Sequence, residues 1–151
     1  MRLNLYKGFP EGYDAMRGLN AAVAASGLDH KLMELVKVRC SQLNGCAYCL
    51  DMHWKDAKVL GEADHRLYSL PAWRETGFYT GGERAALELA EAITLLATSH
   101  VPDDVLDRAR EHFDDEQLSR LVFAVVVINA WNRLAVTAGM EAGRYQPASD
   151  D

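Results

Sequence analysis

A cluster of thiol and imidazole side chains lies between positions 46 and 53, where the chain reads Cys46-Ala-Tyr-Cys49-Leu-Asp-Met-His53. The cysteines are three residues apart and the histidine follows four residues later, so on a helix all three side chains share one face. Such a face offers two thiols that can form a disulfide and an imidazole that can accept or shuttle a proton. The segment therefore predicts thiol redox chemistry, either hydroperoxide reduction or dithiol exchange.

The spacing leaves open which cysteine attacks first. Cys46 directly follows Asn44-Gly45 and is expected in the first turn of a helix, where the helix dipole and free N–H groups favour a thiolate. Cys49 lies one turn before His53, which can accept its proton. In either order, the second thiol can condense with a sulfenic acid to give a disulfide.

Three other interpretations compete with redox chemistry. Cys40, Cys46, Cys49 and His53 offer four zinc ligands, but structural zinc sites usually draw their second ligand pair from a separate segment, so we expect no metal. Covalent haem attachment needs a histidine directly after the second cysteine, where this chain has Leu50. The third interpretation is plain core cysteines, which we favour for Cys40 because it is out of phase with the other two.

The elements that must position this cluster are expected to be helices. Apolar residues recur at helical spacing over most of the chain, including the β-branched run from Val125 to Ile128, and no segment alternates over strand length. Asp29 is a candidate helix N-cap, and Asp114 with Gln117 resembles a capping box. These signals predict helices at about 11–25, 30–43, 46–60, 83–97, 103–113 and 114–139, and a shorter stretch at 62–73. The fold class is therefore all-α.

Length and composition place limits on the function. The 151 residues fit one domain, which we take as 1–151 with a core at about 11–143 and arms at 1–9 and 145–151. The net charge of −6 argues against a nucleic-acid partner. No secretory signal is visible, and the longest apolar run, Leu121 to Ile128, is too short for a membrane span. We expect a cytoplasmic protein, and in that reducing compartment a cysteine pair is more often catalytic than structural.

The motif also resembles a known family. Glu34, eleven residues, Cys46-x-x-Cys49-x-x-x-His53 and then Gly61 are similar to the signature of the alkylhydroperoxidase-D-like branch of the carboxymuconolactone decarboxylase family. A later stretch, Ile128-Asn-Ala-Trp-Asn-Arg-Leu134, resembles a second one often seen there. The resemblance implies a helical bundle with the motif on a helical hairpin, a homo-oligomer that is commonly a trimer or hexamer, and hydroperoxide reduction through the paired cysteines.

The resemblance also assigns roles to residues. It makes Cys49 the peroxidatic thiol, Cys46 its resolving partner, and Glu34 and His53 a proton relay, with no bound cofactor and an external dithiol as reductant. A hairpin would bring Glu34 alongside His53, where a carboxylate orients the imidazole and raises its basicity. The competing interpretation of Glu34 is a surface ion pair with one of its lysine neighbours, Lys31 or Lys37.

Some features of the sequence depart from that pattern or leave alternatives open. Tyr48 stands between the cysteines, where some redox members carry a second histidine. The alternatives are a non-catalytic redox sensor or oligomeric binding module, and a decarboxylase- or isomerase-like member with unused thiols.

The polar and aromatic residues on the last helix are Asn129, Trp131, Asn132 and Arg133. We interpret them as residues of helix packing and a subunit interface, with Arg133 in an ion pair. Other aromatic residues could line a pocket for an organic peroxide or could equally be core or interface residues, namely Trp54, Tyr68, Trp73, Phe78 and Tyr79.

Overall fold

The computed structural model describes residues 1–147, and every regular element in that part of the chain is helical. The predicted all-α class is therefore confirmed, while residues 148–151 of the expected C-terminal arm lie outside the described range. A 3-10 segment, Leu70–Glu75, follows the fifth of the α-helices. The α-helices are α1 (Leu5–Gly8), α2 (Pro10–Ala24), α3 (His30–Leu43), α4 (Ala47–Val59), α5 (Asp64–Tyr68), α6 (Gly81–Thr94), α7 (Asp103–Arg110) and α8 (Asp115–Ala138).

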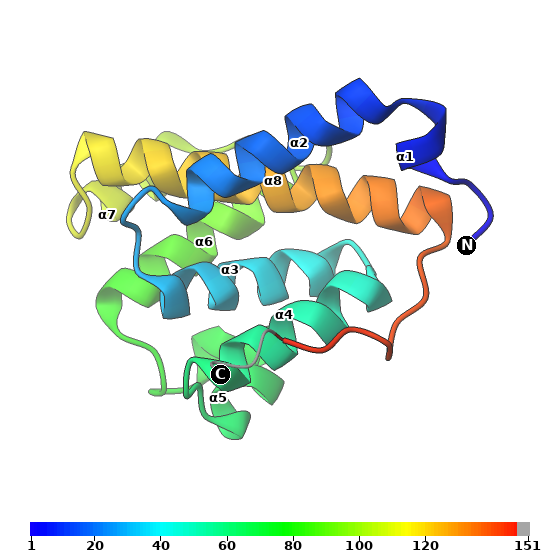
Figure 1. Ribbon diagram of the computed structural model, residues 1–151. Coiled ribbons are helices and arrows are strands. Elements are labelled where there is room, and N and C mark those ends of the chain that lie inside the picture. The colour runs from blue at the N-terminus through cyan, green and yellow to red at the C-terminus, as the bar shows by residue number, and fades with distance from the viewer. Residues whose placement is uncertain (148–151) are drawn as a thin grey trace.

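Helix α3 is the centre of the bundle. It packs against α4, α6 and α8, while α2 lies along the outer side of α8 (Figure 1). Leu35, Val36 and Val38 of α3 are completely buried, because apolar positions around this helix face neighbours on several sides. Among the described residues, α8 is the one helix long and apolar enough to cross a membrane, and it packs on α2, α3 and α6 as a core helix of the bundle.

The helix ends follow the predicted capping chemistry. The Asp29 carboxylate accepts a hydrogen bond from the Leu32 N–H at 2.8 Å. Asp114 and Gln117 form the predicted capping box of α8, with bonds of 2.7 and 3.0 Å. The β-branched run inside α8 is helical, as its surrounding period indicated. Local sequence signals alone were sufficient to predict the helix caps and the helical structure at these positions.

The two chain ends differ from the arms that we expected. Residues 5–8 form α1, which Asn4 caps, and Arg2 donates to the Thr137 carbonyl at 2.9 Å. At the other end the chain turns back beside α4 (Figure 1), and Lys55 donates to the Tyr145 carbonyl at 2.9 Å. These ends lack helical periodicity and are held by partners far away in sequence, so nothing local reveals that they are anchored.

A buried carboxylate joins α6 to α3 and the 3-10 segment. Glu91 accepts hydrogen bonds from Arg39 Nε at 2.7 Å, Trp73 Nε1 at 2.9 Å and an Arg74 guanidinium nitrogen at 2.6 Å. Burial opposes ionisation, but hydrogen bonds from Arg74, Trp73 and Arg39 outweigh it and lower the pKa of Glu91. The ionised side chain thus satisfies three donors from two other elements, α3 and the 3-10 segment.

Glu91→Ala is expected to lower the free energy of unfolding by about 3–5 kcal/mol at pH 7, because it strands the buried donors of Arg39 and Trp73. Chemical denaturation measures this difference. Since folding lowers the pKa of Glu91, its contribution is complete above the ordinary carboxyl pKa and disappears as the pH falls through the folded value. Glu88→Ala, which breaks the more exposed pair with Arg108, is the control and should lose less than about 1 kcal/mol. Equal losses for the two variants would contradict the structural role of Glu91.

Candidate active site

The turn between α3 and α4 determines where the first cysteine lies. Gly45 has a φ of +64°, a left-handed conformation that glycine adopts without strain. The Gly45 N–H donates to the Gln42 carbonyl at 3.3 Å and the Cys46 N–H to the Ser41 carbonyl at 3.0 Å, which together form a Schellman motif. Cys46 is therefore fixed by the end of α3, and α4 begins at the next residue instead of at Cys46 as predicted.

Cys46 is the N-cap of α4, and it is joined to Cys49 by a disulfide. The Cys46 sulfur also accepts a hydrogen bond from the Cys49 N–H at 3.3 Å. Both cysteines are almost fully buried, each 1% exposed. The third cysteine, Cys40, is a free thiol in the core, where burial raises its pKa to about 12 although the Thr94 hydroxyl donates to its sulfur. Cys40 is thus a core thiol, as its phase indicated.

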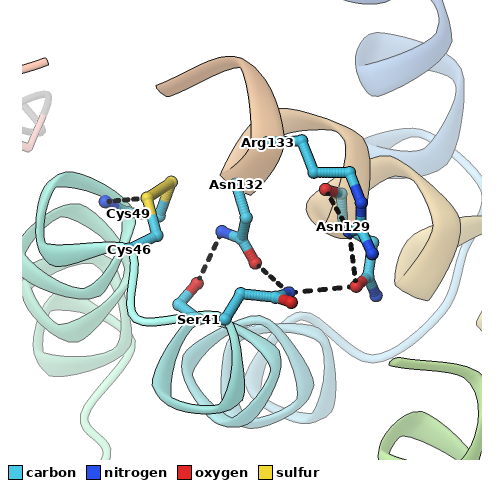
Figure 2. The surroundings of a disulfide bond; sticks show 7 residues. Ser41, Cys46, Cys49, Asn129, Asn132 and Arg133 are labelled. Carbon is cyan, nitrogen blue, oxygen red and sulfur yellow. Dashed lines mark hydrogen bonds between the residues drawn. A yellow bond between two sulfur atoms is a disulfide. The ribbon is translucent and has the colours of Figure 1, made fainter. Parts of the chain in front are cut away.

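A buried polar network fixes the turn to α8 (Figure 2). Asn132 donates to the Ser41 hydroxyl at 3.1 Å and accepts from the Asn44 amide at 2.8 Å. The Asn44 amide also donates to the side-chain oxygen of Asn129 at 3.0 Å. Arg133 donates to the backbone and side-chain oxygens of Asn129, and makes no ion pair with another described residue, contrary to our expectation. The stretch from Ile128 to Leu134, the second one that resembles the family, therefore supports the turn that carries the cysteines.

The hairpin brings Glu34 and His53 together. Their positions are ten residues before and nine residues after Asn44, so the antiparallel helices place them side by side. Glu34 Oε2 is 2.8 Å from His53 Nδ1, while Glu34 Oε1 accepts from Lys37 Nζ at 2.7 Å. Glu34 thus contacts both the imidazole and one of its lysine neighbours, Lys37, but this ion pair is largely buried and not at the surface as the competing interpretation held. Burial opposes ionisation of Glu34, but His53 and then Lys37 outweigh it and lower its pKa.

A second carboxylate approaches the same imidazole. Asp56 Oδ2 is 3.9 Å from His53 Nδ1, and the ligand atoms of Glu34, His53 and Asp56 lie within 4.8 Å of one another. Such atoms can bind a divalent cation, but the Lys37 ammonium on Glu34 opposes one. The zinc set weighed from sequence is not assembled, since Cys40 lies in the core and Cys46 and Cys49 are bonded to each other.

One face of α4 opens into a cavity of about 790 Å³. The lining includes Cys49 and His53 but neither Cys46 nor Glu34, so of the two cysteines it is Cys49 that borders the cavity. An aromatic wall stands opposite, where Tyr13 makes edge contacts with Tyr6 and Trp131 at ring-centroid distances of 5.6 and 5.3 Å. The other lining residues are Arg17, Asn20, Lys37, Tyr48, Met52, Asp56, Ala135 and Met140.

None of the aromatic residues weighed as pocket lining borders this cavity, and the alternative that they are core residues holds for three of them. Trp73 and Tyr79 are buried in a second core cluster, against which Trp54 packs. Tyr68 and Phe78 are exposed. The cavity wall comes instead from α1, α2 and α8. Aromatic residues at helical spacing in the N-terminal region were the available signal for Tyr6 and Tyr13.

Comparisons with known proteins agree with this geometry. Residues 10–92 match the model of the carboxymuconolactone decarboxylase family. The uncharacterised protein YdfG of Bacillus subtilis is 44% identical over 141 residues, which cover 93% of this chain and 96% of YdfG.

Solved structures share the fold. A protein of unknown function from Agrobacterium tumefaciens, named as a candidate AhpD antioxidant defence protein, has a TM-score of 0.91 and 38% identity, covering 95% of this chain and 99% of that one. An uncharacterised peroxidase-related protein with an alkylhydroperoxidase AhpD core, from Ralstonia eutropha, has a TM-score of 0.80, covering 92% of this chain and 74% of that one. At 21% identity, this second similarity shows the fold alone. The chain belongs to the carboxymuconolactone decarboxylase family, in its alkylhydroperoxidase-D-like branch.

Proposed function

We propose that this protein is a thiol-dependent peroxidase that reduces organic hydroperoxides through a Cys46–Cys49 dithiol–disulfide cycle. The observation that carries the proposal is the arrangement around Cys49. Cys49 is bonded to a second cysteine within one helical turn, and it lines a cavity that His53 also lines. A peroxidase of this kind needs a nucleophilic thiol with access to substrate, a resolving thiol and a proton carrier.

The cycle begins with the reduced pair. The Cys49 thiolate attacks the terminal oxygen of the hydroperoxide, the O–O bond breaks, and the alkoxide takes a proton and leaves as an alcohol. Cys49 is then a sulfenic acid. Cys46 attacks the Cys49 sulfur, which releases water and forms the disulfide, and an external dithiol reduces that disulfide back to two thiols.

In this proposal His53 carries the proton. It lies one turn after Cys49 on α4 and lines the same cavity, so it can take the thiol proton and return it to the leaving alkoxide. The Glu34 carboxylate at 2.8 Å from Nδ1 orients the ring and stabilises the imidazolium. Access to the cavity also supports Cys49 as the attacking sulfur, a choice that the sequence spacing left open.

The test is turnover by the purified protein. Reduced protein mixed with one equivalent of cumene hydroperoxide should yield one equivalent of alcohol while the Cys46–Cys49 disulfide forms, as peptide mass spectrometry reports. Adding a dithiol such as dithiothreitol should make the reaction catalytic. Oxidation without catalytic turnover would instead favour the redox-sensor alternative.

The aromatic wall should make the protein prefer bulky hydroperoxides. Tyr13→Ala removes the central ring of the wall and is expected to lower kcat/KM for cumene hydroperoxide by roughly tenfold, since burying an aromatic group is worth one to a few kcal/mol. Hydrogen peroxide cannot use that wall, so its kcat/KM should change less than about twofold.

Tyr68→Ala is the matched control for this prediction, because Tyr68 is an exposed aromatic residue that does not line the cavity. It should leave both rates unchanged. If Tyr13→Ala lowered kcat/KM equally for cumene hydroperoxide and hydrogen peroxide, the assignment of the aromatic wall to substrate binding would be contradicted.

We also propose a homo-oligomer, a trimer or hexamer, acting in the cytoplasm with an external dithiol as electron donor. Exposed apolar side chains on α8, namely Phe123, Val126 and Val136, support association of subunits. Analytical ultracentrifugation of the purified protein tests the subunit count.

A further inference from the structure

The last described residues bind along α4. The Gly143 N–H donates to Asp51 at 3.0 Å, and Lys55 donates to the Tyr145 carbonyl at 2.9 Å. The Tyr145 hydroxyl donates to Asp56 Oδ1 at 2.6 Å. Tyr145 lies beyond residues 10–92, which match the family model, so the motif does not include it. Three bonds thus hold this segment against the helix that carries Cys49 and His53.

Asp56 connects that segment to the candidate site. One of its oxygens accepts from Tyr145, and the other is 3.9 Å from His53 Nδ1. The nitrogen already has Glu34 at 2.8 Å, so the imidazole faces one carboxylate from α3 and one from α4. An opposite charge at such distances favours the protonated form of an imidazole.

We propose that Asp56 and Tyr145 are positioning residues for His53. The Tyr145 hydroxyl holds one oxygen of Asp56, which keeps the other oxygen turned toward the imidazole. The carboxylate then stabilises the imidazolium that forms when His53 takes the Cys49 proton. This role of His53 rests on the proposed function, whereas the effect of Asp56 and Tyr145 on the imidazole does not.

Other charged and titratable groups around His53 also affect the stability of its imidazolium. Burial and then the hydrogen bond to Asp56 raise the pKa of Tyr145, so it stays a hydroxyl donor throughout the neutral range. Lys37 opposes the imidazolium, but its ammonium is paired with Glu34. The charged or titratable groups that share the cavity or contact the ring are Glu34 and Lys37 from α3, Tyr48, Cys49 and Asp56 from α4, and Tyr6, Tyr13 and Arg17 from α1 and α2.

The test is a titration of the imidazole by NMR in the oxidised full-length protein, where the disulfide removes the thiolate. The chain has five histidines, and the spectrum of His53→Gln identifies the resonance of His53. Asp56→Asn should lower the pH midpoint of that resonance by about half to one unit, an effect reduced by partial solvent exposure of Asp56. Tyr145→Phe should lower it by less. In the Asp56→Asn background, Tyr145→Phe should add nothing, because its effect passes through Asp56.

Asp51→Asn is the matched control, since Asp51 binds the same segment but lies two residues from His53 on α4, where the side chains do not face each other. It should leave the midpoint unchanged. An unchanged midpoint in Asp56→Asn, or an equal shift in Asp51→Asn and Tyr145→Phe, would overturn the proposal. Because the titration needs no substrate, a protein without peroxidase activity would refute the proposed function and leave this result standing.

Discussion

Cys49→Ser protein is expected to consume no hydroperoxide above the uncatalysed rate. A serine hydroxyl stays protonated at neutral pH and forms no sulfenic acid, so the attacking atom of the proposed cycle is lost. Cys46→Ser should behave differently, because Cys49, the cysteine that lines the cavity, remains. It should consume one equivalent of peroxide and stop with a sulfenic acid on Cys49, which a sulfenic-acid probe and mass spectrometry detect.

Cys40→Ala is the matched control for these variants. Cys40 is a buried free thiol that does not line the cavity, so the folded variant should keep the wild-type rate. Turnover that survives Cys49→Ser would refute the proposed function. Sulfenic acid on Cys46 in Cys49→Ser protein, with inactive Cys46→Ser protein, would show that the two thiols exchange roles.

Much of the fold can be predicted from the sequence because the signals are local. Helical periodicity, the Asp29 cap and the Asp114 capping box depend on residues within a few positions of one another. The paired placement of Glu34 and His53 was predictable for a related reason. Asn44-Gly45 requires a tight turn, and two antiparallel helices then align positions about equally far from it.

The remainder of the site depends on contacts that no local pattern encodes. Tyr145 reaches Asp56 across 89 positions of the chain, and Tyr13 meets Trp131 across a still longer separation. Neither residue belongs to a periodic or motif-like pattern that points to its partner. The difference between the cysteines also needed the structure, because the spacing leaves both as candidates, whereas Cys49 and not Cys46 lines the cavity.

His53→Gln is expected to lower kcat/KM for cumene hydroperoxide by roughly 10²–10⁴, the usual contribution of a general acid–base group. Glutamine keeps hydrogen-bonding capacity and similar bulk but cannot carry a proton between thiol and alkoxide. The measurement is steady-state turnover with a dithiol, accompanied by circular dichroism to verify folding. Asp64→Asn is the control, since Asp64 is an exposed carboxylate paired with Lys58 and should leave the rate unchanged.

Glu34→Gln should lower the same kcat/KM by roughly ten- to a hundredfold, because in the proposed relay it removes the charge that stabilises the imidazolium. The lowered pKa of Glu34 keeps the wild-type carboxylate ionised throughout the neutral range, so its contribution disappears only as the pH falls below the ordinary carboxyl range. The wild-type and Glu34→Gln profiles should therefore converge in acid. Since Glu34 acts through the imidazole, adding Glu34→Gln to His53→Gln should cost almost nothing further. If the falls in kcat/KM of the two single variants multiplied in the double variant, the two residues would not form one relay.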